Sequence, residues 1–189
     1  LTKHLEGLRE NLYKEMLTSI QETDYTVPRP RGEYLYYSRT FEGKSYSVYC
    51  RAPRTSTAET VDWDGTAESP IVPGEIVLLD VNALAEGQKY CSVGAMKPSP
   101  SHQLVAYSVD FTGGETCKLY VKNVDTGEML DHDETLEIDG SVVWGKDDST
   151  LFYLKMDAAH RPYQVYKRVI GSEQDDELLF QEDDELYWM

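Results

Sequence analysis

Seven side chains of this sequence belong to the types that most readily act as bases, nucleophiles or metal ligands. They are four histidines and three cysteines: His4, His102, His132, His160, Cys50, Cys91 and Cys117. A serine or cysteine hydrolase needs a nucleophile that a nearby histidine activates. No histidine stands near a plausible nucleophile motif in the sequence, so we expect surface or loop positions for all four. The sequence therefore assigns no catalytic residue.

The three cysteines are far apart and form no Cys-x-x-Cys pair. They also show no metal-ligand spacing with the histidines. Each lies in an apolar or β-like segment, so we expect buried, reduced thiols with a structural role. A second candidate metal site is a group of acidic residues, but the calcium-loop pattern D-x-[DN]-x-[DN]-G is absent from it. Its members are Asp131, Asp133, Glu134 and, near His160, Asp157. We predict no metal site and no cofactor.

The strongest charge feature is an acidic tract at residues 173–177, which continues at 182–185. One interpretation is a solvated loop at the edge of a sheet. The alternative is that some of these carboxylates face an inner cavity and attract cationic peptides, since summed charge steers a substrate without touching it.

The composition excludes several classes of partner. The 189 residues include 34 Asp and Glu against 18 Lys and Arg, which gives a net charge of −16. Such a charge argues against nucleic acid and against an anionic membrane surface as main partners. No apolar run approaches the roughly 20 residues that a membrane span requires.

The N-terminal segment, from Leu1 to about Glu22, has the pattern of an amphipathic helix. Its apolar stripe has i, i+3 and i+4 spacing and consists of Leu5, Leu8, Leu12, Met16 and Ile20. We expect this stripe to be a packing face. The helix must end before Pro28 and Pro30, because proline removes a backbone donor and clashes with helical backbone.

The chain then changes to short strands and turns. Two β-rich runs, Glu33–Arg39 and Tyr46–Arg51, flank a turn at Gly43 and predict a hairpin. A third strand, Glu75–Asp80, is apolar enough to be buried on both faces. Ala52–Gly74 has no apolar periodicity, so we interpret it as a long surface insertion or a mobile loop.

An internal repeat follows. Leu104–Asp110 resembles Leu151–Asp157 at an offset of 47 residues, and Tyr37 matches Tyr107 at an offset of 70. Each copy has a second strand and ends in a glycine turn; these are Lys118–Lys122 with Gly127, and Gln164–Arg168 with Gly171.

A period of about 40–50 residues with four short strands per unit is typical of a β-propeller. We therefore predict a mainly β fold, with an N-terminal helical segment at 1–26 and a partial propeller at 27–189 that carries the insertion at 52–74. Three units and the start of a fourth, at Glu185–Met189, cannot close a ring of roughly four to eight blades. The chain is thus expected to be the front of a larger propeller.

Several stretches carry a family resemblance in their order and spacing. They are Glu22–Tyr25, Tyr46–Arg51, Glu75–Asn82, Leu119–Glu128 and Tyr163–Tyr166. Together they resemble the prolyl oligopeptidase family of serine peptidases and, within it, the oligopeptidase B group. The resemblance covers nearly the whole chain except Ala52–Gly74.

This resemblance implies an enzyme in which a seven-bladed propeller packs on a C-terminal α/β-hydrolase domain and gates access to the active site. The unpaired cysteines and the absence of an Asn-x-Ser/Thr site suit a reducing cytoplasm. The resemblance also implies a Ser-Asp-His triad and cleavage after Lys or Arg in short, basic peptides. The nucleophile pattern G-x-S-x-G is absent from this chain, and Gly43-Lys44-Ser45-Tyr46-Ser47 comes nearest but lacks the second glycine. The triad and the pocket for the basic side chain are thus expected outside this chain, and the substrate-binding residues are unknown.

The alternative is a non-catalytic β-propeller scaffold for protein–protein interaction. Such repeats often carry Trp-Asp signatures at blade ends. The single Trp-Asp pair here, Trp63-Asp64, lies inside the insertion, which counts against the scaffold. An exposed Trp63 could mark a binding surface, whereas Trp144 is expected in the core.

Overall fold

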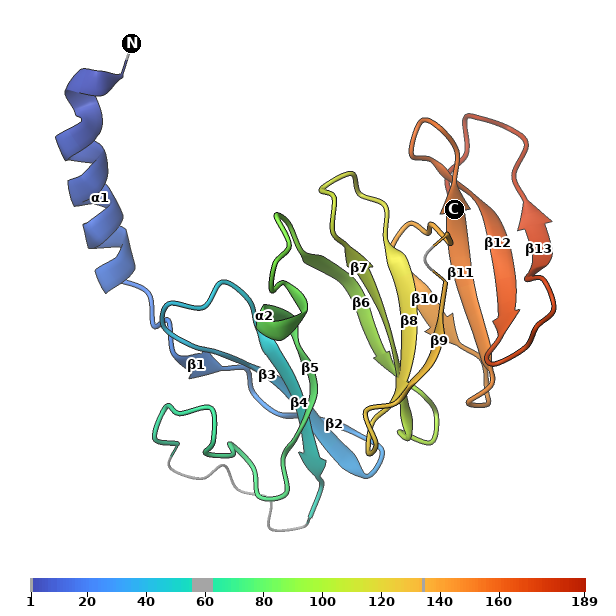
Figure 1. Ribbon diagram of the computed structural model, residues 1–189, viewed down its shortest axis with the longest axis horizontal. Coiled ribbons are helices and arrows are strands. Elements are labelled where there is room, and N and C mark those ends of the chain that lie inside the picture. The colour runs from blue at the N-terminus through green and yellow to red at the C-terminus, as the bar shows by residue number, and fades with distance from the viewer. Residues whose placement is uncertain (1, 56–62, 134) are drawn as a thin grey trace. The chain divides into compact units, whose positions relative to one another are not determined.

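The structure is a computed structural model that describes residues 2–55, 63–133 and 135–189. It contains two compact units, Leu1–Asn82 and Ala83–Met189, whose elements are labelled in Figure 1. Residues 56–62 of the predicted insertion and the candidate metal ligand Glu134 lie outside the described residues, as does Leu1. The prediction of a mainly β fold behind an N-terminal helix is confirmed.

The N-terminal helix is shorter than predicted. A 3-10 turn, η1 (Lys3–Leu5), leads into α1 (Glu6–Thr18). The hydroxyls of Thr18 and Ser19 both donate to the carbonyl of Glu15, and such side-chain bonds compete with continuation of the helix. No residue of α1 is buried, and Leu8 and Met16 remain 56% and 59% exposed. The packing role of the apolar stripe therefore stays a prediction.

The first unit holds one antiparallel sheet. Its strands are β1 (Asp24–Tyr25), β2 (Arg29–Arg31), β3 (Tyr34–Thr40), β4 (Val48–Pro53) and β5 (Ile76–Asp80). β3 and β4 form the predicted hairpin, with Tyr37 opposite Cys50. β5 lies at the sheet edge, beside β4 only. Ile76 and Val77 are 36% and 47% exposed, so the prediction that this strand is buried on both faces is wrong.

The described part of the insertion is anchored to the first sheet. Ile71 and Val72 are completely buried against Tyr37 and Cys50, and Trp63 packs beside them. A mobile surface loop without apolar anchors is thus the wrong interpretation for this part. Two adjacent apolar residues within a polar segment produce no periodicity, and pattern analysis overlooks such isolated anchors.

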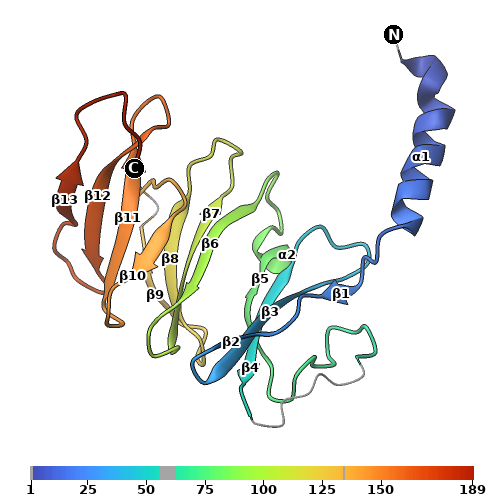
Figure 2. The same cartoon turned by 180° about the vertical axis from the view of Figure 1, so that it is seen from behind.

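The second unit contains two four-stranded antiparallel sheets, which lie side by side in both views (Figures 1 and 2). A short helix, α2 (Val81–Leu84), precedes them. The second sheet consists of β6 (Ser92–Pro98), β7 (Leu104–Asp110), β8 (Lys118–Asn123) and β9 (Met129–His132). The third consists of β10 (Val142–Trp144), β11 (Thr150–Met156), β12 (Pro162–Val169) and β13 (Glu177–Gln181). Each follows its chain order from one edge to the other.

The repeat is real, but its offset is 46 residues and not 47. Tyr107 faces Tyr120 across β7 and β8, and Tyr153 faces Tyr166 across β11 and β12. Both tyrosine pairs stack, with ring centroids 5.2 and 5.6 Å apart. A shift of one residue along a strand moves every side chain to the other face. The structure therefore aligns Tyr107 with Tyr153, where an offset of 47 would align it with Leu154.

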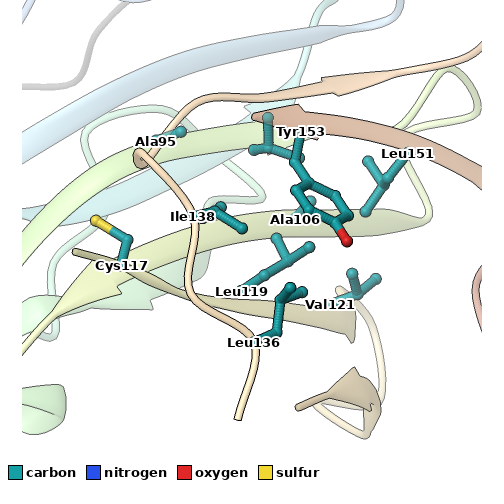
Figure 3. Close-up of a cluster of buried hydrophobic side chains, with 10 residues drawn as sticks. Ala95, Ala106, Cys117, Leu119, Val121, Leu136, Ile138, Leu151 and Tyr153 are labelled. Carbon is teal, nitrogen blue, oxygen red and sulfur yellow. The ribbon is translucent and has the colours of Figure 1, made fainter. Parts of the chain in front are cut away.

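The largest buried cluster joins the two sheets of the second unit (Figure 3). Leu119 and Val121 of β8 meet Leu151 and Tyr153 of β11 in this cluster. Full burial of one large apolar side chain contributes roughly 1.5–3 kcal/mol. Because neither sheet buries these residues alone, each sheet depends on its neighbour, as the repeat architecture requires.

The C-terminal residues, where the start of a fourth unit is predicted, form no strand, and that prediction stays untested. Glu185–Met189 forms a turn and irregular backbone after β13. Arg161, only 7% exposed, donates from Nη1 to the carbonyls of Asp184 and Tyr187. These bonds tie the segment back to the turn between β11 and β12.

Candidate functional site

The histidines that the sequence singled out lie in separate segments. His4 is exposed in η1. His102 and His160 occupy the turns that precede β7 and β12, both with left-handed backbone, φ 66° and 60°. His132 is the last residue of strand β9. The expectation of surface or loop positions therefore holds for His4, His102 and His160.

All three cysteines are buried and free, as predicted. Burial raises the pKa of the Cys50 thiol to about 12, with a smaller contribution from the negative charge of Glu75. Burial also raises the pKa of Cys91 and of Cys117. Because the thiolate is the nucleophilic form, these groups stay protonated and unreactive near neutral pH.

A polar hollow of the second unit, termed the Arg168 hollow, has a volume of about 330 Å³. Its lining comes from the segment after β9, from β11 and β12, and from the loop before β13. The charged and aromatic lining residues are Asp133, Tyr153, Lys155, Tyr166, Arg168, Asp175 and Asp176. Three residues that the sequence considered, Asp133, Asp175 and Asp176, are therefore brought together here.

Arg168 organises this hollow. Its guanidinium donates from Nε and Nη2 to Asp131 at 3.1 and 2.8 Å, and from Nη1 to Asp176 at 3.0 Å. Asp133 lies farther away, 4.0 Å from Nη1. Asp176 also accepts the Tyr153 hydroxyl at 2.6 Å. The network thus links β9 of the second sheet to both β11 and β12 of the third.

Three groups at the hollow have shifted pKa values. Burial alone would lower the pKa of Arg168, but the hydrogen bonds and charges of Asp131 and Asp176 outweigh it and raise that pKa. Burial and the bond to Asp176 raise the pKa of Tyr153. A hydrogen bond from the Thr135 side chain lowers the pKa of Asp133. Near neutral pH, Arg168 and Asp133 therefore stay charged and Tyr153 stays a neutral phenol, which suits electrostatic binding and interlocking of sheets better than proton transfer.

The acidic tract divides between the two interpretations. Asp175 and Asp176 line the hollow, but Asp176 is neutralised by Arg168. Glu173, Glu177 and most of 182–185 are exposed to solvent. The sequence of the second unit, Ala83–Met189, contains 21 Asp and Glu against nine Lys and Arg. This unit therefore carries most of the negative charge of the chain, largely on exposed loops.

A second polar cluster, in the first unit, was missed by sequence reasoning. Arg39 and Glu75 form an ion pair at 3.0 Å, with side chains only 2% and 5% exposed. Glu75 also accepts the Tyr37 hydroxyl at 2.5 Å. No local motif predicts this cluster, because Glu75 is 36 residues from Arg39 and 38 from Tyr37, and these residues meet only in the folded sheet.

Two further observations concern metals and membranes. Across the described ranges, no group of three or more His, Cys, Asp or Glu side chains is placed to hold a metal ion. Neither of the described helices is long and apolar enough to cross a membrane.

The tryptophans are packed to different degrees. Trp63 is half-buried, and it meets Tyr25 and Phe41 edge-to-face, each with ring centroids 5.8 Å apart. Trp144 packs on the core cluster and donates its indole N–H to the carbonyl of Lys97. Trp188 is 71% exposed. Trp63 is therefore a packing residue and no longer marks a binding surface.

Comparison with known proteins gives a consistent answer along the chain. A family model described as the N-terminal beta-propeller domain of prolyl oligopeptidase matches residues 1–189. Protease 2 from Moraxella lacunata is 31% identical over 189 residues, which cover 99% of this chain and 26% of that protein. Dipeptidyl aminopeptidase BI from Pseudoxanthomonas mexicana is 33% identical over 187 residues, which cover 98% and 26%.

A solved structure agrees with these relatives. Oligopeptidase B from Trypanosoma brucei, in a closed form with covalently bound antipain, superposes with a TM-score of 0.82 at 35% identity. The match covers 99% of this chain and 24% of that one. The chain thus spans about a quarter of the length of the proteins it resembles.

Proposed function

Because the chain belongs to the prolyl oligopeptidase family, as its N-terminal β-propeller domain, we propose that it is the propeller portion of a serine oligopeptidase of the oligopeptidase B type. The family resemblance drawn from the sequence is confirmed. The proposed enzyme hydrolyses peptide bonds after Lys or Arg in short peptides, and the propeller gates access to the active site.

One observation carries the proposal. The similarity to oligopeptidase B runs over 99% of the chain at 35% identity, with a TM-score of 0.82. The net charge of −16 supports the preference for basic peptides, because a negative surface raises the local concentration of cationic substrates. The Arg168 hollow supplies no triad, so the proposed role of this chain is access and packing.

Two further parts of the proposal concern partners and location. The exposed stripe of α1, which includes Leu8 and Met16, is proposed to pack on a C-terminal α/β-hydrolase domain. A cytoplasmic location is proposed because three free cysteines and the absence of an Asn-x-Ser/Thr site suit a reducing compartment.

The test compares fluorogenic substrates on the full-length protein. A blocked Arg-Arg peptide and a blocked Lys peptide should be cleaved with a kcat/KM at least about 100-fold above that of a matched Pro peptide. Because one relative is named a dipeptidyl aminopeptidase, an unblocked dipeptide substrate is included. Faster release of the dipeptide than cleavage of the blocked peptides would contradict the proposed specificity.

The isolated 189-residue chain is the control, and it should not turn over the Arg-Arg peptide because it lacks a nucleophile elbow. Turnover by this fragment that disappears on mutation of one of its own serines would refute the assignment. A full-length protein that binds partners but cleaves none of the substrates would favour the non-catalytic scaffold.

A further inference from the structure

One face of the first sheet is covered by a segment of its own unit. In the third sheet, the face that bears Tyr153 packs against the neighbouring second sheet. Tyr37 holds the corresponding place in β3. Each tyrosine lies on the second strand in the order of its sheet and faces the residue 13 positions later. Yet Tyr37 is buried under Ile71 and Val72, which belong to the chain segment that leads into β5 of its own sheet.

This segment, residues 63–75, is here named the strap. Arg39 of β3 binds the middle of the strap. Its Nη1 donates to the carbonyl of Ser69 at 2.8 Å, and its Nη2 donates to the carbonyl of Ala67 at 3.1 Å. Glu75 fastens the end of the strap, since it pairs with Arg39 and accepts the backbone N–H of Ile71 at 3.0 Å. One buried ion pair thus holds the strap at several points.

The ends of the strap have the backbone of hinges. Gly65 and Gly74 have left-handed φ values of +83° and +79°, a conformation that glycine adopts without strain. The indole N–H of Trp63 closes the first bend by donating to the carbonyl of Thr66. Between these two glycines, only Ile71 and Val72 are fully buried apolar residues. The attachment of the strap therefore depends on few side chains.

We propose that the strap is a latched cover over the Tyr37 face of the first sheet, which Arg39 and Glu75 hold in place. Loss of the latch releases residues 66–73 as one piece, while β3 and β4 stay paired. This inference goes beyond the proposed peptidase function and does not depend on it.

Cys50 provides a reporter of release. It is completely buried beneath the strap, whereas Cys91 and Cys117 lie in the second unit and serve as internal references. The test variant is Arg39→Met/Glu75→Met in the full-length protein. It removes both charges together, because a single removal would leave an uncompensated buried charge.

The expected result is labelling of Cys50 by N-ethylmaleimide that is at least about tenfold faster in the variant, with unchanged labelling of Cys91 and Cys117. Hydrogen exchange should accelerate at residues 66–73 and not in β3 or β4. The matched control, Glu6→Met/Arg9→Met, removes an exposed ion pair on α1 and should leave all rates unchanged. Unchanged labelling of Cys50 in the test variant would overturn the proposal.

A measurement on the unmodified protein covers the case in which the variant does not fold. Native-state hydrogen exchange in low denaturant should show residues 66–73 opening together, and before β3 and β4. Exchange of the strap only together with the strands of the first sheet would make it an integral core element and would refute the latch.

Discussion

The Tyr153 hydroxyl donates to Asp176 at 2.6 Å, and this pair has a counterpart in the first sheet, where Tyr37 donates to Glu75 at 2.5 Å. In both cases the carboxylate comes directly before the outer strand of its sheet, and an arginine completes the cluster. The tyrosine, the acid and the arginine thus fasten the loop that leads into the outer strand onto the face of the sheet.

The Arg168 network should contribute more to the stability of the third sheet than the surface ion pairs do. Replacing Arg168 by Met leaves Asp131 and Asp176, whose side chains are only 12% and 16% exposed, without their cation. We expect a loss of about 2–4 kcal/mol in the free energy of opening of β11 and β12, because an unpaired, mostly buried charge is poorly solvated. Native-state hydrogen exchange measures this quantity.

Lys167→Met is the matched control for Arg168. Lys167 and Glu177 are 36% and 61% exposed, so their pair should contribute less than about 1 kcal/mol. Equal effects of the two substitutions would show that the network adds nothing beyond an ordinary surface pair.

Tyr107 should make the stability of the second sheet sensitive to alkaline pH. Burial raises the pKa of Tyr107 from 10.0 to about 12, with a smaller contribution from Tyr120. A pKa that is higher in the folded state contributes stability that is complete below pH 10 and is lost as the pH rises from about 10 to about 12.

The Tyr107→Phe variant should therefore lose less stability than the unmodified protein over this pH window, as followed by hydrogen-exchange protection of β7. Tyr13→Phe, at an exposed position of α1, is the control and should follow the unmodified protein. Identical pH profiles for Tyr107→Phe and the unmodified protein would contradict the prediction.

Gly94 should not tolerate a side chain. An added Cβ would lie 2.9 Å from Ser108 Oγ and 3.1 Å from Gly140 Cα. Ser108 Oγ accepts the N–H of Ala95 and donates to the carbonyl of Gly140, so it cannot move without breaking buried bonds. We expect Gly94→Ala to destabilise the propeller by about 1–3 kcal/mol through overpacking, as measured by calorimetry. Gly7→Ala, with open space around it, should have no destabilising effect.

The isolated 189-residue chain should aggregate or remain partly molten. Large apolar side chains are exposed on α1, on β13 and at the C-terminal segment, among them Met16 at 59%, Phe180 at 50% and Leu186 at 86%. Covering several such residues is worth roughly 1.5–3 kcal/mol each, which is comparable with the whole stability of a domain. Size-exclusion chromatography and calorimetry provide the test. A monodisperse monomer with a sharp unfolding transition would contradict this expectation.

Local patterns in the sequence were sufficient to predict the helix, the first hairpin, the repeated strands and the family. These features depend on periodicity and turn chemistry within some ten to fifty residues, which a single sequence displays directly. The matching of Tyr37 with Tyr107 also agrees with the strand register, since each faces the residue 13 positions later.

Only the tertiary structure decided the register of the repeat and the contacts between distant segments. Strand periodicity cannot distinguish an offset of 47 from one of 46, yet this single step determines whether Tyr107 aligns with Tyr153 or with Leu154. Arg39 meets Glu75, and Arg168 meets Asp131, because the folded sheets bring residues nearly forty positions apart to one place. Such pairing depends on three-dimensional proximity and burial, which composition and spacing do not encode.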